Sequence, residues 1–403
     1  MKIRLFMGAL MLLTLAAFGC ARATEPLEEG GRAAELVKSG MELHKQGQFA
    51  KAVALYGEAI QLNPRYAEAF SNRGYSYYYL KQYEKANQDE DKAIGLNSKD
   101  AHAYYYRGIA YNELAQYRVA LYDFDKAISL APEFAKPYSN RGISYANLGQ
   151  LDRALKDYDE AIRLDPGYAK AYLNRGSAYT RLGQHQSAFS DYNESVRLDP
   201  RLASAYSGRA GAYIIFGEYG LAIEDANTAL SLDPMETEAY VRRGAAHSER
   251  GDHALAFKDF DEAIRLDPED WFVYYNRAAV YSNMVDYKER AIEDYHRTLQ
   301  LRLFPAALNE RGEVYYDLRR YEQAIDDFDE ALRLYPDYVE AYHNRALAYT
   351  ALRRDAEAQK DYNKAVSLGD DANLLRMLME DIKTWQLALL LSDCMDRRYW
   401  TIV

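Results

Sequence analysis

The sequence contains few of the residues on which covalent and metal-based sites depend. Only two cysteines, Cys20 and Cys394, occur among its 403 residues, which excludes a disulfide framework and a paired-cysteine metal site. None of the seven histidines is followed by glutamate, and the dipeptide Gly-Lys is absent, so a HExxH zinc motif and a Walker A phosphate loop are excluded. A G-x-S-x-G nucleophile elbow is missing as well. We therefore expect that the protein is not an enzyme and that it binds no metal and no cofactor. A catalytic site would have to use Asp393, Cys394 and Asp396, and no histidine is near them in sequence.

Basic residues are also fewer than acidic residues. The chain has 50 lysines and arginines against 61 aspartates and glutamates, a formal net charge of −11. Binding to nucleic acid requires clustered basic residues that neutralise phosphates, so we do not expect it. A composition that is 49% hydrophobic and 28% charged is typical of a folded globular chain.

The first residues are typical of an export signal. Lys2 and Arg4 precede the apolar run 5–18, which is shorter than the ~20 residues of a membrane-spanning helix. The sequence Ala-Phe-Gly-Cys that ends at Cys20 resembles a bacterial lipobox. This resemblance implies that residues 1–19 are a signal peptide and that Cys20 is acylated.

The residue after the cysteine bears on the destination. Ala21 stands where many inner-membrane lipoproteins have aspartate, so the resemblance favours an outer-membrane lipoprotein that faces the periplasm. Cleavage after Ala23 is the alternative and would give a soluble periplasmic or secreted protein; an unprocessed chain is a third possibility. Residues 20–32, which include Pro26, Gly30 and Gly31, are expected to be a polar tether.

A 34-residue period fills most of the remaining chain. Glycine recurs at this spacing at residues Gly40, Gly74, Gly108, Gly142 and Gly176. Alanine recurs with the same period at Ala52, Ala86, Ala120, Ala154, Ala188 and Ala222. Proline does so at Pro64, Pro132, Pro166, Pro200, Pro234, Pro268 and Pro336. Counted from Ala33, small residues occupy positions 8, 20 and 27 and proline occupies position 32, a pattern that resembles the tetratricopeptide repeat (TPR).

The periodic positions explain why each unit should fold as two helices. Positions 4, 8 and 11 share one helix face, and positions 20, 24 and 27 share a face of the next helix. Small residues let the two helices approach closely, and the proline ends the second helix because it lacks an N–H donor. The apolar faces of such units are covered only by their neighbours. The resemblance predicts ten repeats over 33–66, 67–100, 101–134, 135–168, 169–202, 203–236, 237–270, 271–304, 305–338 and 339–372.

The predicted fold is therefore all-α, a right-handed TPR superhelical solenoid of ten 34-residue helix-turn-helix repeats. Residues 373–403 should form a C-terminal capping helix and tail. Its apolar stripe consists of Leu375, Leu378, Ile382, Trp385 and Leu389. The eighth repeat carries one extra residue within 284–291 and lacks the usual Asp-Pro, so we expect a kink or looser joint near 286–305.

One charge pattern repeats with the fold. Position 7 is arginine in nine repeats: Arg73, Arg107, Arg141, Arg175, Arg209, Arg243, Arg277, Arg311 and Arg345. Position 23 is aspartate in the same nine, displaced by one residue in the eighth: Asp89, Asp123, Asp157, Asp191, Asp225, Asp259, Asp294, Asp327 and Asp361. The first repeat lacks both, which favours structural Arg–Asp pairs within each repeat over a cationic groove for anions.

The TPR resemblance also implies a concave groove lined by positions 2, 5, 6, 9, 12 and 13 of the first helices. Position 6 is asparagine in five repeats: Asn72, Asn140, Asn174, Asn276 and Asn344. This resembles the asparagine ladder of the O-linked N-acetylglucosamine transferase TPR region, whose amides bind the backbone of an extended peptide. The ladder is broken at Tyr106, Gly208, Arg242 and Glu310, and the alternative is surface asparagine without a partner. A chaperone-type carboxylate clamp is not expected, because no repeat has lysine at position 5.

Tyrosine is abundant, with 38 residues. Most of them fall at the packing positions 4, 11, 17 and 24. Seven instead fall on the expected groove: Tyr75, Tyr78, Tyr79, Tyr105, Tyr106, Tyr275 and Tyr316. Five of these belong to the second and third repeats and could anchor a partner, unless their rings only lean on neighbouring helices.

These observations predict a non-enzymatic scaffold of the cell envelope that binds partner proteins or extended peptides. Such a protein would be anchored in the membrane through Cys20. The alternatives are a soluble periplasmic or secreted TPR adaptor, and an assembly chaperone or regulatory subunit of a pilus, secretion or cell-wall complex.

Overall fold

The computed structural model describes residues 30–399. Over this range the chain forms twenty-one α-helices and no strand, arranged as ten helix pairs followed by one long helix. This is the expected all-α solenoid of helix-turn-helix repeats. The signal peptide and Cys20 lie outside the described residues. The chain divides after Pro200 into two compact units.

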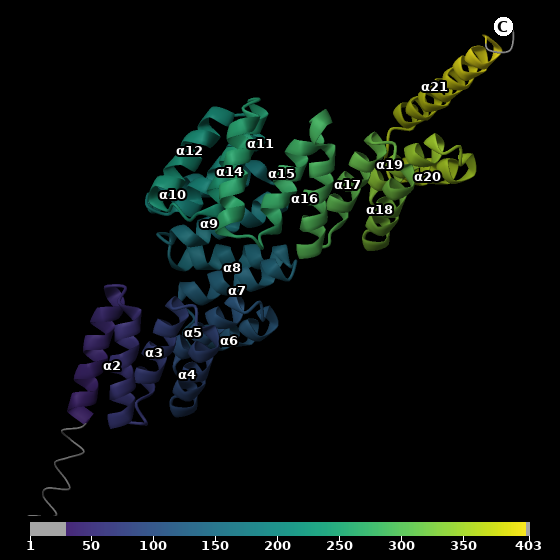
Figure 1. Cartoon of the computed structure of the whole chain (residues 1–403). Coiled ribbons are helices and arrows are strands. Elements are labelled where there is room, and N and C mark those ends of the chain that lie inside the picture. Colours follow the sequence, from purple (N-terminus) through teal and green to yellow (C-terminus); the bar gives the residue numbers. More distant parts are fainter. Residues whose placement is uncertain (1–29, 400–403) are drawn as a thin grey trace, which may run out of the picture. The chain divides into compact units, whose positions relative to one another are not determined.

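The first unit holds five helix pairs that follow one another side by side (Figure 1). Its first helix covers residues 30–45 and so begins inside the segment expected to be tether. The others are α2 (Phe49–Leu62), α3 (Ala67–Tyr79), α4 (Tyr83–Leu96), α5 (Ala101–Glu113), α6 (Tyr117–Leu130), α7 (Ala135–Asn147), α8 (Leu151–Leu164), α9 (Ala169–Arg181) and α10 (His185–Leu198).

The second unit holds five more pairs and the last helix. Its helices are α11 (Ala203–Ile215), α12 (Tyr219–Leu232), α13 (Thr237–Glu249), α14 (His253–Leu266), α15 (Trp271–Ser282), α16 (Lys288–Leu301), α17 (Pro305–Asp317), α18 (Tyr321–Leu334), α19 (Val339–Ala351), α20 (Asp355–Ser367) and α21 (Ala372–Tyr399). None of the helices in the described part of the chain combines the length and apolar character needed to cross a bilayer.

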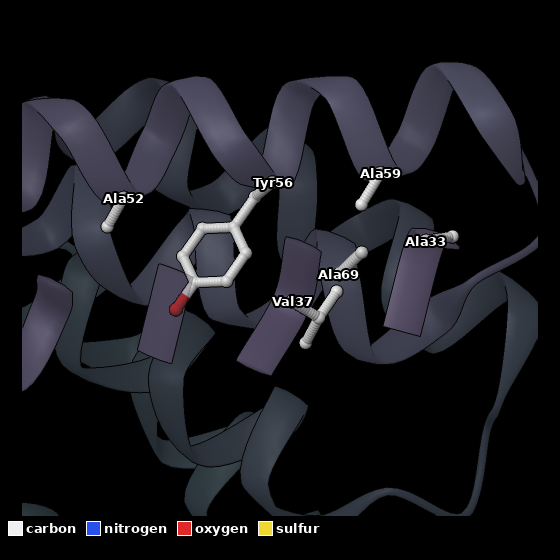
Figure 2. Packing of buried hydrophobic residues seen from close by; sticks show 6 residues of the cluster. All are labelled: Ala33, Val37, Ala52, Tyr56, Ala59 and Ala69. Atoms are coloured by element: carbon white, nitrogen blue, oxygen red, sulfur yellow. The ribbon is translucent and has the colours of Figure 1, made fainter. Parts of the chain in front are cut away.

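In eight of the ten repeats, an aromatic ring at position 24, displaced by one residue in the eighth, fills the space left by a small residue at position 8. A β-carbon added to Gly142 would lie 2.5 Å from the ring of Tyr158, which is closer than atoms can approach. The first repeat is packed in the same way, with Tyr56 of α2 pointing toward the first helix near Val37 (Figure 2). This close approach is the physical reason for the periodic glycine.

The irregular eighth repeat keeps its two helices. The extra residue is absorbed between α15 and α16 by a short 3₁₀ helix, η1 (Val285–Tyr287). Without an Asp-Pro, three residues connect α16 to α17, and the first and last of them, Arg302 and Phe304, are extended. Pro305 occupies the first turn of α17, where its missing N–H is not needed. Both departures from the regular repeat lie at the ends of α16.

Helix α21 packs on the last repeat. Leu375 and Met379 are buried against Tyr362 and Ala358 of α20. Leu378 and Ile382 of the expected stripe are half-buried. The side chains of the other two stripe residues, Trp385 and Leu389, lie outside the described part.

Candidate functional site

The nine position-7 arginines are used inside the fold. In every case Nε and Nη2 donate to the two carboxylate oxygens of the position-23 aspartate; for Arg107 and Asp123 these distances are 2.8 and 2.6 Å. The same bidentate contact joins Arg73–Asp89, Arg141–Asp157, Arg175–Asp191, Arg209–Asp225, Arg243–Asp259, Arg277–Asp294, Arg311–Asp327 and Arg345–Asp361. These guanidinium groups are therefore not arranged as a cationic groove.

The same arginines also reach the preceding repeat, which sequence analysis missed. Nη1 of Arg107 donates to Asp91 at 2.6 Å, and Asp91 is position 25 of the repeat before. Equivalent contacts join Asp125–Arg141, Asp159–Arg175, Asp261–Arg277 and Asp329–Arg345. Each such arginine therefore links one aspartate of its own repeat with one of its neighbour.

The tyrosines of the second and third repeats form a layer of packed rings. Tyr75 stacks between His44 and Tyr106, with ring centroids 4.8 and 4.1 Å apart. Tyr79 stacks on Phe49 at 4.7 Å and is 46% exposed. Desolvation of the half-buried Tyr106 raises the pKa of its hydroxyl to about 12, so this ring stays neutral.

Tyr105 does not belong to an exposed surface, contrary to the expectation. It is only 9% exposed, because the rings of Phe124 and Phe134 pack against it and Asn140 of the next repeat donates to its hydroxyl at 3.3 Å. Tyr78 is half-buried and donates to Glu113 at 3.1 Å. Among the five tyrosines that the sequence places on the groove in these two repeats, Tyr79 alone is exposed.

The asparagines at position 6 donate hydrogen bonds within the fold. Nδ2 of Asn72 donates to the backbone oxygen of Glu68 at 2.9 Å, and Asn276 does the same with Phe272 at 2.7 Å. The other three reach position 5 of the preceding repeat, in the pairs Asn140–Tyr105, Asn174–Ser139 and Asn344–Asn309. The expected ladder of peptide-binding amides therefore has part of its donor capacity already in use.

Two adjoining hollows lie on the first helices of repeats 8 to 10. The first, of about 480 Å³, is lined by Ala279, Ser282, Asn283, Val285, Lys288, Tyr295, Glu310, Glu313, Val314 and Asp317. The second, of about 540 Å³, is lined by Glu313, Val339, Glu340, His343, Asn344, Leu368, Gly369, Asp370 and Asp371. Glu313 contributes to both. Most of the lining from α15, α17 and α19 comes from the positions expected to face a groove.

The hollows are acidic, and two of their carboxylates are bound by neutral groups. Glu310 is half-buried and accepts hydrogen bonds from the hydroxyls of Tyr275 and Tyr295, the latter at 2.8 Å. Burial raises the pKa of Glu310 above its ordinary value. In the sequence, Glu310 is recognisable only as a break in the asparagine ladder.

Glu313, one turn further along α17, has a similar environment. It accepts from Asn309 at 2.6 Å and from Asn344 at 2.7 Å. Its side chain is open to solvent, yet the walls of the two hollows displace part of the surrounding water, and this desolvation raises its pKa. By contrast, Asp317 pairs with Lys288, and Asp370 contacts the ring of His343 at 2.8 Å.

The remaining groove candidates do not line either hollow. Tyr275 contributes through its bond to Glu310, whereas Tyr316 packs against Tyr321 with ring centroids 5.3 Å apart. No group of three or more histidine, cysteine or acidic side chains among the described residues is placed to hold a metal ion.

The repeats of this chain match known protein families. Family models described as TPR repeat or tetratricopeptide repeat match residues 40–81, 139–203, 237–270, 305–338 and 339–368. Sperm-associated antigen 1 of Rattus norvegicus and of Mus musculus are 29% and 30% identical to the chain over 98 residues. That match covers 24% of this chain and only 11% of each relative.

A solved structure shows the same fold over nearly the whole chain. The crystal structure of the APC/C heterotetramer Cut9–Hcn1 is 16% identical, with a TM-score of 0.55, and the match covers 92% of this chain and 94% of the other. The family matches, the helix pairs and this likeness agree. The chain belongs to the tetratricopeptide repeat proteins, and its architecture is that of a protein–protein interaction scaffold.

Proposed function

We propose that the protein is an envelope scaffold that holds a partner by an extended, positively charged segment seated in the hollows of repeats 8 to 10. The observation that carries this proposal is the pair of carboxylates, Glu310 and Glu313, whose hydrogen bonds come only from neutral donors among the described residues. A partly desolvated carboxylate with a cationic partner makes a shorter and stronger hydrogen bond than one with a neutral donor.

The shape of the site supports an extended ligand. The two hollows share Glu313, so a segment lying in both would pass this carboxylate and contact the first helices of three successive repeats. Lysine or arginine of the partner would reach Glu313 or Glu310, while Ser282, Asn283 and Asn344 offer polar groups to its backbone.

The envelope part of the proposal is supported by the N-terminal sequence. The basic start, the apolar run 5–18 and Cys20 are the features that an exported, acylated protein requires. Radioactive palmitate should label the wild-type protein in membranes, and Cys20→Ala should abolish the label. A labelled Cys20→Ala protein, or an unlabelled wild type, would contradict the anchor.

Binding can be tested with an array of peptides divided equally into lysine- and arginine-rich, neutral, and acidic sequences. The basic group should bind best, and Glu313→Gln should weaken its best members roughly tenfold or more, because a charge-assisted hydrogen bond contributes about 1.5–3 kcal/mol. The matched control is Glu322→Gln, which removes an exposed carboxylate from the second helix of the ninth repeat, away from the hollows. Equal binding of neutral and basic peptides, or equal effects of the two substitutions, would overturn the proposal.

A further inference from the structure

Glu90 is a carboxyl group enclosed in the core of the second repeat. It lies at position 24, where the other repeats have tyrosine or phenylalanine, apart from Ala226. Its side chain is 0% exposed, and neither carboxylate oxygen has a hydrogen-bond partner. Asn87, one turn earlier on α4, likewise has a buried side-chain oxygen without a partner. Two such groups on one helix make α4 unusual among the second helices.

The carboxyl occupies the space that an aromatic ring fills elsewhere. A β-carbon added to Gly74 would lie 2.7 Å from Oε1 of Glu90, just as one on Gly108 would lie 2.6 Å from the ring of Phe124. The contact between α3 and α4 therefore has the same geometry as in other repeats but places an ionisable group at its centre.

The charged groups around Glu90 are already engaged with other partners. On α4, Asp89 is bound by Arg73 of α3. On the side of α5, Arg107 is bound to Asp123 and Asp91, and Asp100 accepts from the backbone N–H groups that begin the helix.

Two polar groups near Glu90 are neutral. Ser71 of α3 presents a hydroxyl, and Tyr106 of α5 presents a phenol. Burial raises the pKa of Glu90 well above the ordinary value, and Asp100 and Asp89 act in the same direction, whereas Ser71 and Arg107 oppose it.

We infer that Glu90 makes the second repeat a proton-linked element: α3 and α4 stay packed while the buried carboxyl is neutral, and its ionisation opens this helix pair. An ionised carboxylate without a partner in an apolar interior is very costly, and exposure to water relieves that cost. Because Tyr75 and the exposed Tyr79 are carried by α3, opening would also dismantle the stacked rings of the second repeat.

The pH dependence of the stability of the second repeat follows from the raised pKa of Glu90. Below the ordinary glutamate value near 4.5 the carboxyl is protonated whether the repeat is closed or open, so stability is at its highest there. Above it the open form releases a proton and the closed form does not, so stability falls as the pH rises toward the raised value of the closed form. Over that window the opening equilibrium constant increases about tenfold per pH unit.

Hydrogen–deuterium exchange of the full chain at several pH values between 5 and 8 tests this inference. Peptides of α3 and α4 are compared with peptides of α7 and α8, the helices of the fourth repeat, where Tyr158 occupies the position of Glu90. This internal reference removes the intrinsic pH dependence of the exchange rate. In the wild type the exchange of α3–α4 relative to α7–α8 should rise with pH, and in Glu90→Gln the ratio should be flat. A second variant, Glu90→Phe, restores the ring and should also be flat, with stronger protection. A constant ratio in the wild type, or the same rise in both variants, would overturn the inference.

Discussion

Removing Arg175 alone should be much more destabilising than removing it together with Asp191. Its Nε and Nη2 each donate to Asp191 at 2.8 Å, and Nη1 donates to Asp159 at 2.7 Å. The side chains of Arg175 and Asp191 are 19% and 8% exposed, so Arg175→Leu leaves an enclosed carboxylate without its cation. Breaking one side of a buried pair costs about 3–5 kcal/mol, whereas replacing both sides with apolar groups is often close to neutral.

Two smaller contributions are lost in both variants and so do not affect the comparison. The guanidinium lies over the rings of Tyr172 and Tyr179, 5.5 and 6.0 Å from their centroids, which contributes about 0.5–1 kcal/mol each. Asp159 has a side chain that is 56% exposed, and its pairing contributes less than about 1 kcal/mol. We therefore expect Arg175→Leu with Asp191→Leu to recover at least about 2 kcal/mol of the loss caused by Arg175→Leu.

The assay should report on this repeat alone, because neighbouring repeats can open separately. Hydrogen exchange of α9 and α10 peptides at increasing urea concentration gives the local free energy of opening for the wild type and the two variants. Asp159→Asn is the control and should stay within about 1 kcal/mol of the wild type. Equal losses for the single and double variants would refute the reasoning, since no uncompensated buried charge would then be responsible.

Three further tests address packing, exposure and charge. In chemical denaturation, Gly142→Ala should destabilise the protein by about 1–3 kcal/mol, because the added methyl group would overlap the ring of Tyr158. Gly95→Ala meets no neighbouring atom and should stabilise the protein by about 0.5–1 kcal/mol. Effects of equal sign would contradict this explanation. Tyr79→Ala should leave the circular dichroism unchanged and cost about 0.5–1.5 kcal/mol, because it removes a stacked but exposed ring. Tyr105→Ala should cost about 3–5 kcal/mol, and comparable losses would place both rings in the core. A cation favours the ionised carboxylate, and burial raises the pKa of Glu310 above the ordinary glutamate value near 4.5. Affinity for basic peptides should therefore increase as the pH rises above that value in fluorescence anisotropy, and less so in Glu310→Gln; an identical profile would exclude this group.

The sequence predicts contacts within a repeat far better than contacts between repeats. Arg175 and Asp191 belong to one helix pair, so their separation in sequence and the helical period suffice to place them together. Asp159 joins the same guanidinium from the preceding repeat, and this contact depends on how two repeats stack, which a period alone does not specify.

Errors in the candidate site have the same origin. Tyr105 is on the groove side of α5 by register, but Asn140 and Phe134 of the following segment cover it. Glu310 interrupts the asparagine pattern, and only the structure shows that two tyrosine hydroxyls orient it beside a hollow. In each case the deciding neighbour lies in another helix, where side-chain length and packing rather than periodicity determine the contact.

The arginine that joins aspartates of two repeats makes it easier for the chain to gain or lose a whole repeat. A duplicated repeat carries the arginine its predecessor can bind and the position-25 aspartate its successor can bind, so gain or loss of one whole unit leaves the new junction with a matched pair. Four repeats that precede an arginine depart from this rule, because at position 25 they have Gly57, Asn193, Asn227 or the displaced His296 in place of the aspartate. Changes in repeat number among related chains should therefore concentrate where the aspartate is present.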